Sequence, residues 1–107
     1  MDNKISIRMS DKPNKKLYAT VNGKKIYFGG IKPDGVPYSD FTEHKNPDRK
    51  ERYILRHEKR EKQFWNRDGI MTPSFWSRFI LWNQPTLQKS IDDTNKRFNL
   101  NIQFSRN

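Results

Sequence analysis

Three side chains come closest to a catalytic arrangement, by their types and by their spacing. Asp40 and His44 are four residues apart, so on a helix the carboxylate would lie on the same face as the imidazole and orient it as a general base. His57 follows thirteen residues later and would extend this pair toward a nuclease-like site. Such pairs also arise by chance in charged segments, and no paired carboxylates, phosphate-binding loop or nucleophile motif accompanies them. We therefore expect no catalytic residue and no enzymatic activity.

A metal or cofactor site is also not indicated by the sequence. The chain has no cysteine, which excludes disulfides and thiolate ligands for zinc. Two histidines thirteen residues apart would need carboxylates to complete a zinc site. His57 falls on a narrow apolar helix face, so we interpret it as a half-buried structural residue. We expect no metal and no cofactor.

The charge of the chain points to an anionic partner. The net charge is +10 and the pI is about 10.0, which favours nucleic acid, an anionic membrane surface or an acidic protein face. No apolar run approaches the ~20 residues that cross a bilayer, and the N-terminus does not resemble a signal peptide. We expect a soluble, intracellular protein without a membrane span, in a reducing compartment.

The elements that would carry these charges begin with a helix at residue 47. Asn46 is a suitable N-cap and Pro47 suits the first helical position, and the periodicity continues to about Phe64 or Trp65. We expect its basic residues to contact phosphates: Arg49, Lys50, Arg52, Arg56, Lys59 and Arg60. The alternative is a solvated helix with i,i+4 ion pairs such as Glu58 with Lys62. Residues 39–69 hold nine basic and seven acidic side chains, so both interpretations stay open.

The stretch KKLYATVNGKKIYFGG predicts a β-hairpin. Asn22 and Gly23 suit a type I′ turn, because both central positions of that turn need positive φ. The resulting register places an apolar face opposite a face of tyrosines and lysines. We expect this second face to bind single-stranded nucleic acid, with rings for stacking and cations for phosphates: Lys16, Tyr18, Lys25 and Tyr27. The alternative is a cross-strand tyrosine pair that only stabilises the hairpin.

The stretch TPSFWSRFILWN predicts a central helix, because its apolar residues surround most of the helix axis. We expect Phe75, Phe79 and Trp82 to lie inside the domain. A domain of this size has little material to cover every side of such a helix. We therefore expect Trp76 or Leu81 to lie at a protein contact, where tryptophan is favoured as an anchor.

The remaining segments complete an α+β domain over residues 1–107. KISIRMS alternates as a strand, PTLQKSIDDTNKRF has helical periodicity, and NLNIQFS alternates as a last strand that could join the hairpin. The expected fold is thus an N-terminal hairpin, with possible flanking strands from both termini, packed on about three helices. The strand order and the oligomeric state do not follow from the sequence.

Three motifs resemble a family of small basic proteins from large double-stranded DNA viruses of eukaryotes. They are NGKxxxFG in the hairpin, Y-x-D-F-T-x-H-K-x-P-x-R-K-x-R-Y-I-x-R-H-x-x-R-E at residues 38–61, and FWSRFxLWN-x-P-T from residue 75. The resemblance covers roughly residues 16–91. This chain differs from the family pattern in a longer GGIKPDGVPYS loop and in Phe79, where the pattern has tryptophan. The family is largely uncharacterised, so the resemblance implies a viral setting and no particular activity.

Charge and resemblance together give two functional expectations. The first is a non-enzymatic, virion-associated protein that binds nucleic acid, DNA before RNA, mainly through phosphate contacts. The second is a small minor capsid or scaffold protein that contacts neighbouring capsid subunits. In the second case the two ends of the chain would extend from the domain and add strands to a partner sheet. In both cases the protein would be found in the virion and in the interior of the host cell.

Overall fold

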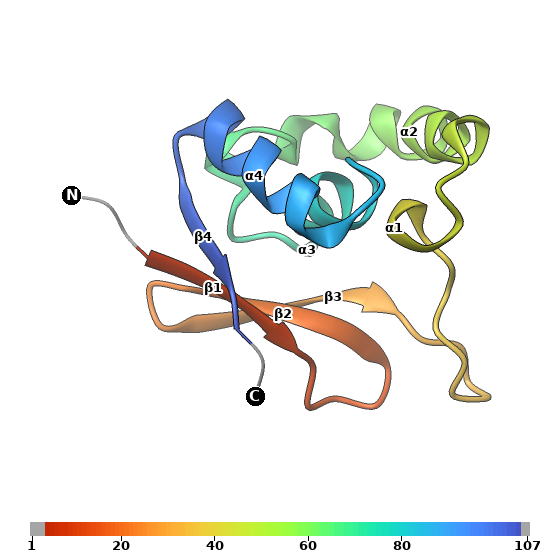
Figure 1. Ribbon diagram of the computed structural model, residues 1–107, viewed down its shortest axis with the longest axis horizontal. Coiled ribbons are helices and arrows are strands. Elements are labelled where there is room, and N and C mark those ends of the chain that lie inside the picture. The colour runs from red at the N-terminus through yellow and green to blue at the C-terminus, as the bar shows by residue number, and fades with distance from the viewer. Residues whose placement is uncertain (1–3, 106–107) are drawn as a thin grey trace.

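Residues 4–105 are described by a computed structural model, in which helices cover one face of a four-stranded sheet (Figure 1). The strands are β1 (Lys4–Met9), β2 (Lys15–Val21), β3 (Lys24–Gly30) and β4 (Asn101–Phe104). The helices are α1 (Phe41–His44), α2 (Pro47–Glu61), α3 (Pro73–Trp76) and α4 (Leu87–Phe98), with short 3₁₀ turns η1 (Lys62–Phe64) and η2 (Arg67–Gly69) and a π-helical turn η3 (Ser77–Leu81). The α+β prediction is confirmed.

The predicted hairpin forms with its predicted register. Asn22 and Gly23 have φ values of 51° and 81°, as a type I′ turn requires. Leu17 pairs with Phe28 and Tyr18 pairs with Tyr27. Because side chains alternate between the two faces of a strand, this register directs one set of β2 and β3 residues to the helices and leaves the other set on the open face.

The two terminal strands belong to the protein's own sheet. The strand order is β3-β2-β1-β4, and β4 pairs in parallel with β1, with Ile5 opposite Ile102. The last strand therefore does not join the hairpin, and the described parts of both ends do not extend away from the domain. Residues 1–3 and 106–107, which were part of the expected partner-binding ends, lie outside the described residues.

The core lies between the sheet and the helices. Its buried residues come from all four strands, from residues 75–81 and from α4: Ile5, Ile7, Leu17, Ala19, Val21, Ile26, Phe28, Phe75, Trp76, Phe79, Ile80, Leu81, Ile91 and Ile102. Burial of each of the larger side chains contributes about 1.5–3 kcal/mol to folding. Within residues 4–105, no helix has the length and apolar character that crossing a membrane requires.

Trp76 and Leu81 lie in the protein's own core, so the predicted protein contact at these two residues is wrong. Trp76 is 0% exposed, with its ring centroid 6.3 Å from that of Phe28 in the sheet, and Leu81 is 5% exposed. The helix begins as expected at the N-cap Thr72 but ends in η3, where the Trp82 N–H donates to the Ser77 carbonyl. A π turn takes up one extra residue and rotates the positions that follow it. Leu81 is therefore buried, while Trp82 is half-buried and faces α2.

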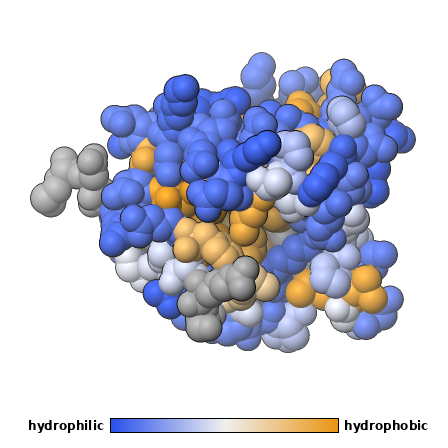
Figure 2. All heavy atoms as spheres, viewed as in Figure 1, coloured by the Kyte–Doolittle hydropathy of each residue, from blue (hydrophilic) through white to orange (hydrophobic). Residues whose placement is uncertain are grey.

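A connection of ten residues, 31–40, leads from β3 to the helical layer (Figure 1). Its residues Lys32 and Tyr38–Asp40 line the cleft described below. The connection ends at Asp40, whose side chain caps α1 by accepting from the Thr42 N–H. The helix α2 follows at once, capped by Asn46 as predicted and with Pro47 in its first turn. The regular part of α2 ends at Glu61, slightly before the predicted end. Hydrophilic side chains cover most of the face drawn in Figure 2, above all over the helices.

Candidate functional site

One face of α2 carries five basic side chains and no acidic one. At about 100° per residue, the five fall within an arc of about 100° around the helix axis. We call this set the basic face: Arg49, Arg52, Arg56, Lys59 and Arg60. All five are exposed. The four acidic residues of α2 lie outside the arc, with Asp48 at its edge. Basic and acidic side chains are nearly equal in number over residues 39–69, but on α2 the basic ones are concentrated on one face.

The basic face has few partners within the protein. Arg52 Nε donates weakly to the Asp48 carbonyl oxygen, at 3.4 Å. Within residues 4–105, the side chains of the other four members form no hydrogen bond or ion pair. The ion pair predicted between Glu58 and Lys62 is also absent from this part of the chain. These cations are therefore free to bind an external anion.

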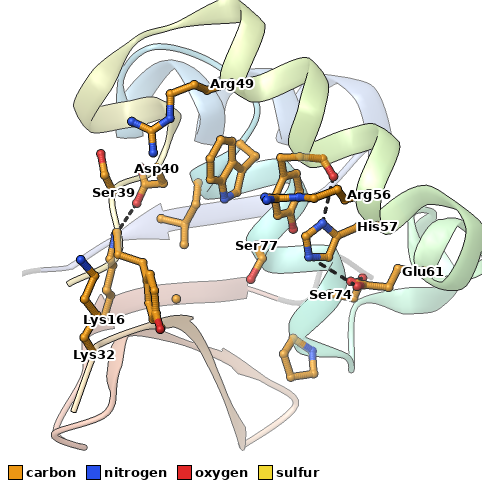
Figure 3. Close-up of a pocket in the computed structure, with 17 residues that line it drawn as sticks. Lys16, Lys32, Ser39, Asp40, Arg49, Arg56, His57, Glu61, Ser74 and Ser77 are labelled. Carbon is orange, nitrogen blue, oxygen red and sulfur yellow. Dashed lines mark hydrogen bonds and ion pairs between the residues drawn. The ribbon is translucent and has the colours of Figure 1, made fainter. Parts of the chain in front are cut away.

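A cleft of about 620 Å³ lies next to the basic face. One side of it is formed by α2, and the other by the end of the hairpin and the 31–40 connection. Arg49 and Arg56 project from the α2 side, and Lys32 lies on the opposite side (Figure 3). Beside the cleft, Trp82 and three arginines of the basic face line a smaller recess of about 190 Å³. The basic face and the cleft thus form one continuous cationic surface.

Stacked rings hold α2 against the central helix. Tyr53 stacks on Trp82, with ring centroids 4.4 Å apart and planes inclined by 2°, and His57 stacks on the other face of Tyr53 at 4.2 Å. Burial raises the pKa of the Tyr53 hydroxyl. His57 Nε2 lies 3.9 Å from Glu61 Oε2, and Glu61 accepts a hydrogen bond from Ser74. This stack fixes the rotation of α2 about its axis, and so sets the direction in which the basic face points.

Lys16 holds the other side of the cleft in place. Its Nζ lies 2.6 Å from Asp40 Oδ2 and 2.8 Å from Glu43 Oε1, and it also donates to the Tyr38 carbonyl oxygen. The Asp40 side chain is 4% exposed and that of Lys16 is 11% exposed. Lys16 therefore joins β2 to the end of the 31–40 connection through an almost fully buried ion pair.

Gly29 permits close packing on the floor of this cleft. Its φ is 82°, and a Cβ built there would lie 3.0 Å from Leu81 and from Lys16. A side chain at this position would be both strained and crowded. The glycine therefore allows Lys16 to reach Asp40 while Leu81 packs beneath it.

Most α2 residues predicted from the sequence are brought together, with one exception. Lys50 lies off the basic face and is half-buried, with its Nζ 5.1 Å from the centroid of the Phe41 ring. Burial, and then the positive charges of Arg78 and Arg97, lower the pKa of Lys50. We therefore remove Lys50 from the set of predicted phosphate contacts.

The predicted stacking platform on the hairpin is not available as expected. Tyr18 is 8% exposed, and the ammonium group of Lys25 lies 5.0 Å from its ring centroid. Lys12 lies 4.3 Å from the centroid of Tyr27, whose hydroxyl donates to Asp11. This hydrogen bond raises the pKa of Tyr27 to about 12.

The two tyrosine rings lie 5.2 Å apart as a cross-strand pair, which is the alternative interpretation of the hairpin. Lys16 does not join them but binds Asp40. We therefore correct the predicted platform at Lys16 and Tyr18. Lys25 and Tyr27 remain on the open face of the sheet, already in contact with protein groups.

The weak catalytic candidates have structural partners. The Asp40 carboxylate binds Lys16 and Thr42, and His44 Nδ1 accepts from the Asn46 N–H at 2.9 Å. His44 Nε2 is buried without a partner in the described chain. Burial, and then the positive charge of Arg49, lower the pKa of His44. Among residues 4–105 no three His, Asp or Glu side chains gather in a group that would hold a metal ion.

Three cleft residues were not predicted from the sequence. Lys32 and Tyr38 were not assigned to a site, and Trp82 was expected inside the domain but lines the cleft. Lys32 and Tyr38 lie in a connection without periodicity, so no local pattern indicated which way they face. Tyr38 is 54% exposed. The phase of Trp82 depends on the π turn, which the apolar pattern of the helix did not reveal.

Comparison with known proteins gives one family match. Residues 5–57 match a family described as a family of unknown function (DUF5754). The match begins in β1 and ends within α2, so it includes the hairpin, the 31–40 connection and the residues Arg49, Arg52 and Arg56. No curated protein and no solved structure matches the chain.

Proposed function

We propose that this protein binds nucleic acid, mainly through contacts between phosphates and the basic face of α2 together with the adjoining cleft. The observation that supports the proposal is the segregation of charge on α2. Five exposed cations share one face, and four of them form no hydrogen bond or ion pair within residues 4–105. In this proposal the protein acts by binding and carries out no reaction.

The dimensions of the basic face suit a phosphate backbone. From Arg49 to Arg60 the helix rises about 16 Å at 1.5 Å per residue. Phosphates along one strand of duplex DNA rise about 3.4 Å each along the axis while the strand winds around it, so a straight face of this length can contact a few phosphates of one strand. Guanidinium groups bind phosphate oxygens in a bidentate manner. Four of the five residues are arginines, and Arg49, Arg52 and Arg56 also line the recess beside Trp82.

The capsid interpretation receives less support from the fold. It expected ends that extend toward a partner sheet and exposed aromatic anchors. Instead β1 and β4 pair with each other, and Trp76 is fully buried. The resemblance to proteins of large DNA viruses remains the reason to propose that binding takes place in a virion or an infected cell.

The experiment is a fluorescence-anisotropy titration of labelled DNA over a series of salt concentrations. Each phosphate contact contributes about 0.9 to the slope of log affinity against log salt for duplex DNA, and about 0.7 for a single strand. If Arg49, Arg52 and Arg56 each contact a phosphate, their joint replacement by glutamine lowers the slope by about 2.7 or about 2.1, respectively.

A matched control removes the same charge elsewhere. Lys24, Lys89 and Lys96 are exposed and lie at the hairpin tip and on α4, away from the cleft. Their joint replacement by glutamine lowers the net charge by the same three units and should leave most of the slope intact. Equal losses in both triple variants would show that only the overall charge matters, and would refute the proposed site.

A further inference from the structure

We infer that the cleft selects single-stranded nucleic acid, with Tyr38 stacking on one unpaired base while Arg49, Arg56 and Lys32 contact the phosphates on either side. This inference rests on the proposed function, and it adds the form of nucleic acid and a residue that reads the base. The basic face alone would serve a duplex as well as a single strand.

The size of the cleft favours an unpaired nucleotide. Its volume of about 620 Å³ lies within the range of about 300–1,000 Å³ that is typical of sites for small molecules. Such a space accepts one or two nucleotides but not a double helix. A base within a duplex is paired and stacked, and it reaches a pocket only when it is flipped out, which costs the free energy of pairing and stacking. A single strand avoids that cost.

The charges on the two sides of the cleft are arranged for a strand that passes between them. Arg49 and Arg56 face the cleft from α2, and Lys32 lies on the opposite side (Figure 3). Of the two acidic residues that line the cleft, Asp40 is paired with Lys16, while Glu61 accepts a hydrogen bond from Ser74 and keeps its charge. One carboxylate thus opposes the three cations Lys32, Arg49 and Arg56. The positive charge that remains uncompensated can therefore act on phosphates.

Among the rings that line the cleft, Tyr38 is the most suitable for stacking on a base. Tyr53 is 7% exposed, and both of its faces are covered, by Trp82 and by His57. Tyr38 is 54% exposed. Its backbone N–H donates to the Gly30 carbonyl at 3.1 Å, and its carbonyl accepts from Lys16, so the main chain that carries the ring is held at the cleft wall.

The neighbours of Tyr38 fit the same role. A Cβ on Gly30 would lie 3.0 Å from the Tyr38 ring, so the absence of a side chain there lets the ring lie against the strand. The Lys32 ammonium group lies over the ring, 5.6 Å from its centroid, so a base that stacks on this face would displace it toward the neighbouring phosphate. The 54% exposure of Tyr38 leaves room for this exchange, which the 8% exposure of Tyr18 does not. An exposed ring beside a cation is the arrangement that proteins use on single strands.

The experiment compares Tyr38→Ala and Tyr38→Phe on three labelled probes of equal length: a thymidine single strand, a duplex, and a single strand with abasic sites. Stacking of one base predicts that Tyr38→Ala weakens binding of the thymidine strand by about 5- to 150-fold. Tyr38→Phe keeps the ring and should retain most of the affinity. Affinity for the duplex should change less than about 2-fold, because the phosphate contacts remain.

The abasic strand distinguishes the loss of base stacking from a change in the conformation of the 31–40 connection. The unchanged protein should bind it more weakly than the thymidine strand, and Tyr38→Ala should cause no further loss. If Tyr38→Ala has no effect on the thymidine strand, or weakens all three probes equally, the inference is wrong. It is also wrong if poly-glutamate competes as well as a single strand, because the site would then recognise charge alone.

The failure of this inference differs from failure of the proposed function. Suppose that the unchanged protein binds single strand and duplex with equal affinity, and that the arginine replacements lower the salt slope. The proposed phosphate binding is then supported, and the inferred selectivity for single strands is wrong. If the unchanged protein binds none of the three probes, both the proposed function and the inferred selectivity are wrong.

Discussion

Lys16→Met should destabilise the protein strongly, because it removes the cation from a nearly buried ion pair. The Asp40 carboxylate is 4% exposed and would keep only its hydrogen bonds from Thr42 after the substitution. Loss of one partner of a buried pair typically costs about 3–5 kcal/mol, since the remaining charge is left uncompensated. The pair with Glu43 adds little, because the Glu43 side chain is 50% exposed. We expect a loss of about 3 kcal/mol.

The assay is urea unfolding followed by tryptophan fluorescence, with the free energy extrapolated to water. Lys15→Met is the matched control, because it makes the same substitution at the neighbouring strand residue, whose side chain forms no ion pair within the described chain. It should change stability by no more than about 0.5 kcal/mol. The double variant Lys16→Met with Asp40→Asn should regain part of the loss, because it removes the stranded charge while asparagine can still cap α1.

Two results would refute this reasoning. In the first, Lys16→Met would unfold at the same urea concentration as Lys15→Met. In the second, the double variant would be no more stable than Lys16→Met alone. Either outcome would mean that the buried pair does not hold the 31–40 connection to β2.

Two further predictions concern the same region. Gly29→Ala should lower the free energy of unfolding by at least about 1 kcal/mol more than Gly35→Ala does. Both glycines have positive φ, but a Cβ would be crowded by Leu81 only at Gly29. Equal losses of stability in urea unfolding would contradict this prediction. His44 has a lowered pKa in the folded protein, caused first by burial and then by Arg49, so the unfolded chain binds more protons below about pH 6.5. Stability should therefore fall as the pH decreases from 7 to 5.5, and His44→Gln should flatten that dependence; an unchanged slope in the variant would show that other groups cause it.

Local patterns in the sequence predicted most of the elements. The Asn22-Gly23 turn set the hairpin register, because both residues must adopt positive φ and side chains alternate from there. The pairs Asn46-Pro47 and Thr72-Pro73 marked two helix starts through capping. These signals act over a few residues, so they survive without knowledge of the tertiary structure.

The parts that were missed depend on contacts between distant segments. The parallel pairing of β4 with β1 joins residues nearly a hundred positions apart, and no turn between them fixes it. Trp76 was expected at the surface but packs against Phe28 of the sheet. The π turn at residues 77–81 rotates the positions at its end, so Leu81 is buried while Trp82, expected inside, is half-buried.

In the candidate site, too, local signals were predicted and contacts between distant segments were not. The positions of Arg49, Arg52 and Arg56 on one face follow from helical periodicity alone. Whether those side chains would be neutralised, and what would lie opposite them, did not follow, because Lys32 and Tyr38 reach the cleft through a connection without regular structure. The hairpin tyrosines were placed correctly in the sheet, but nothing in the sequence indicated that Lys12 and Lys25 would cover their rings.

The most direct test of the central claim is a two-dimensional ¹⁵N NMR titration of the protein with a short thymidine strand. The account predicts that the largest changes in chemical shift occur at Lys32, at Tyr38 and along α2 from Arg49 to Arg60. Residues on the open face of the sheet, such as Tyr18 and Tyr27, should change little. Changes centred on Tyr18 and Tyr27, with α2 unaffected, would contradict the account and place binding on the sheet.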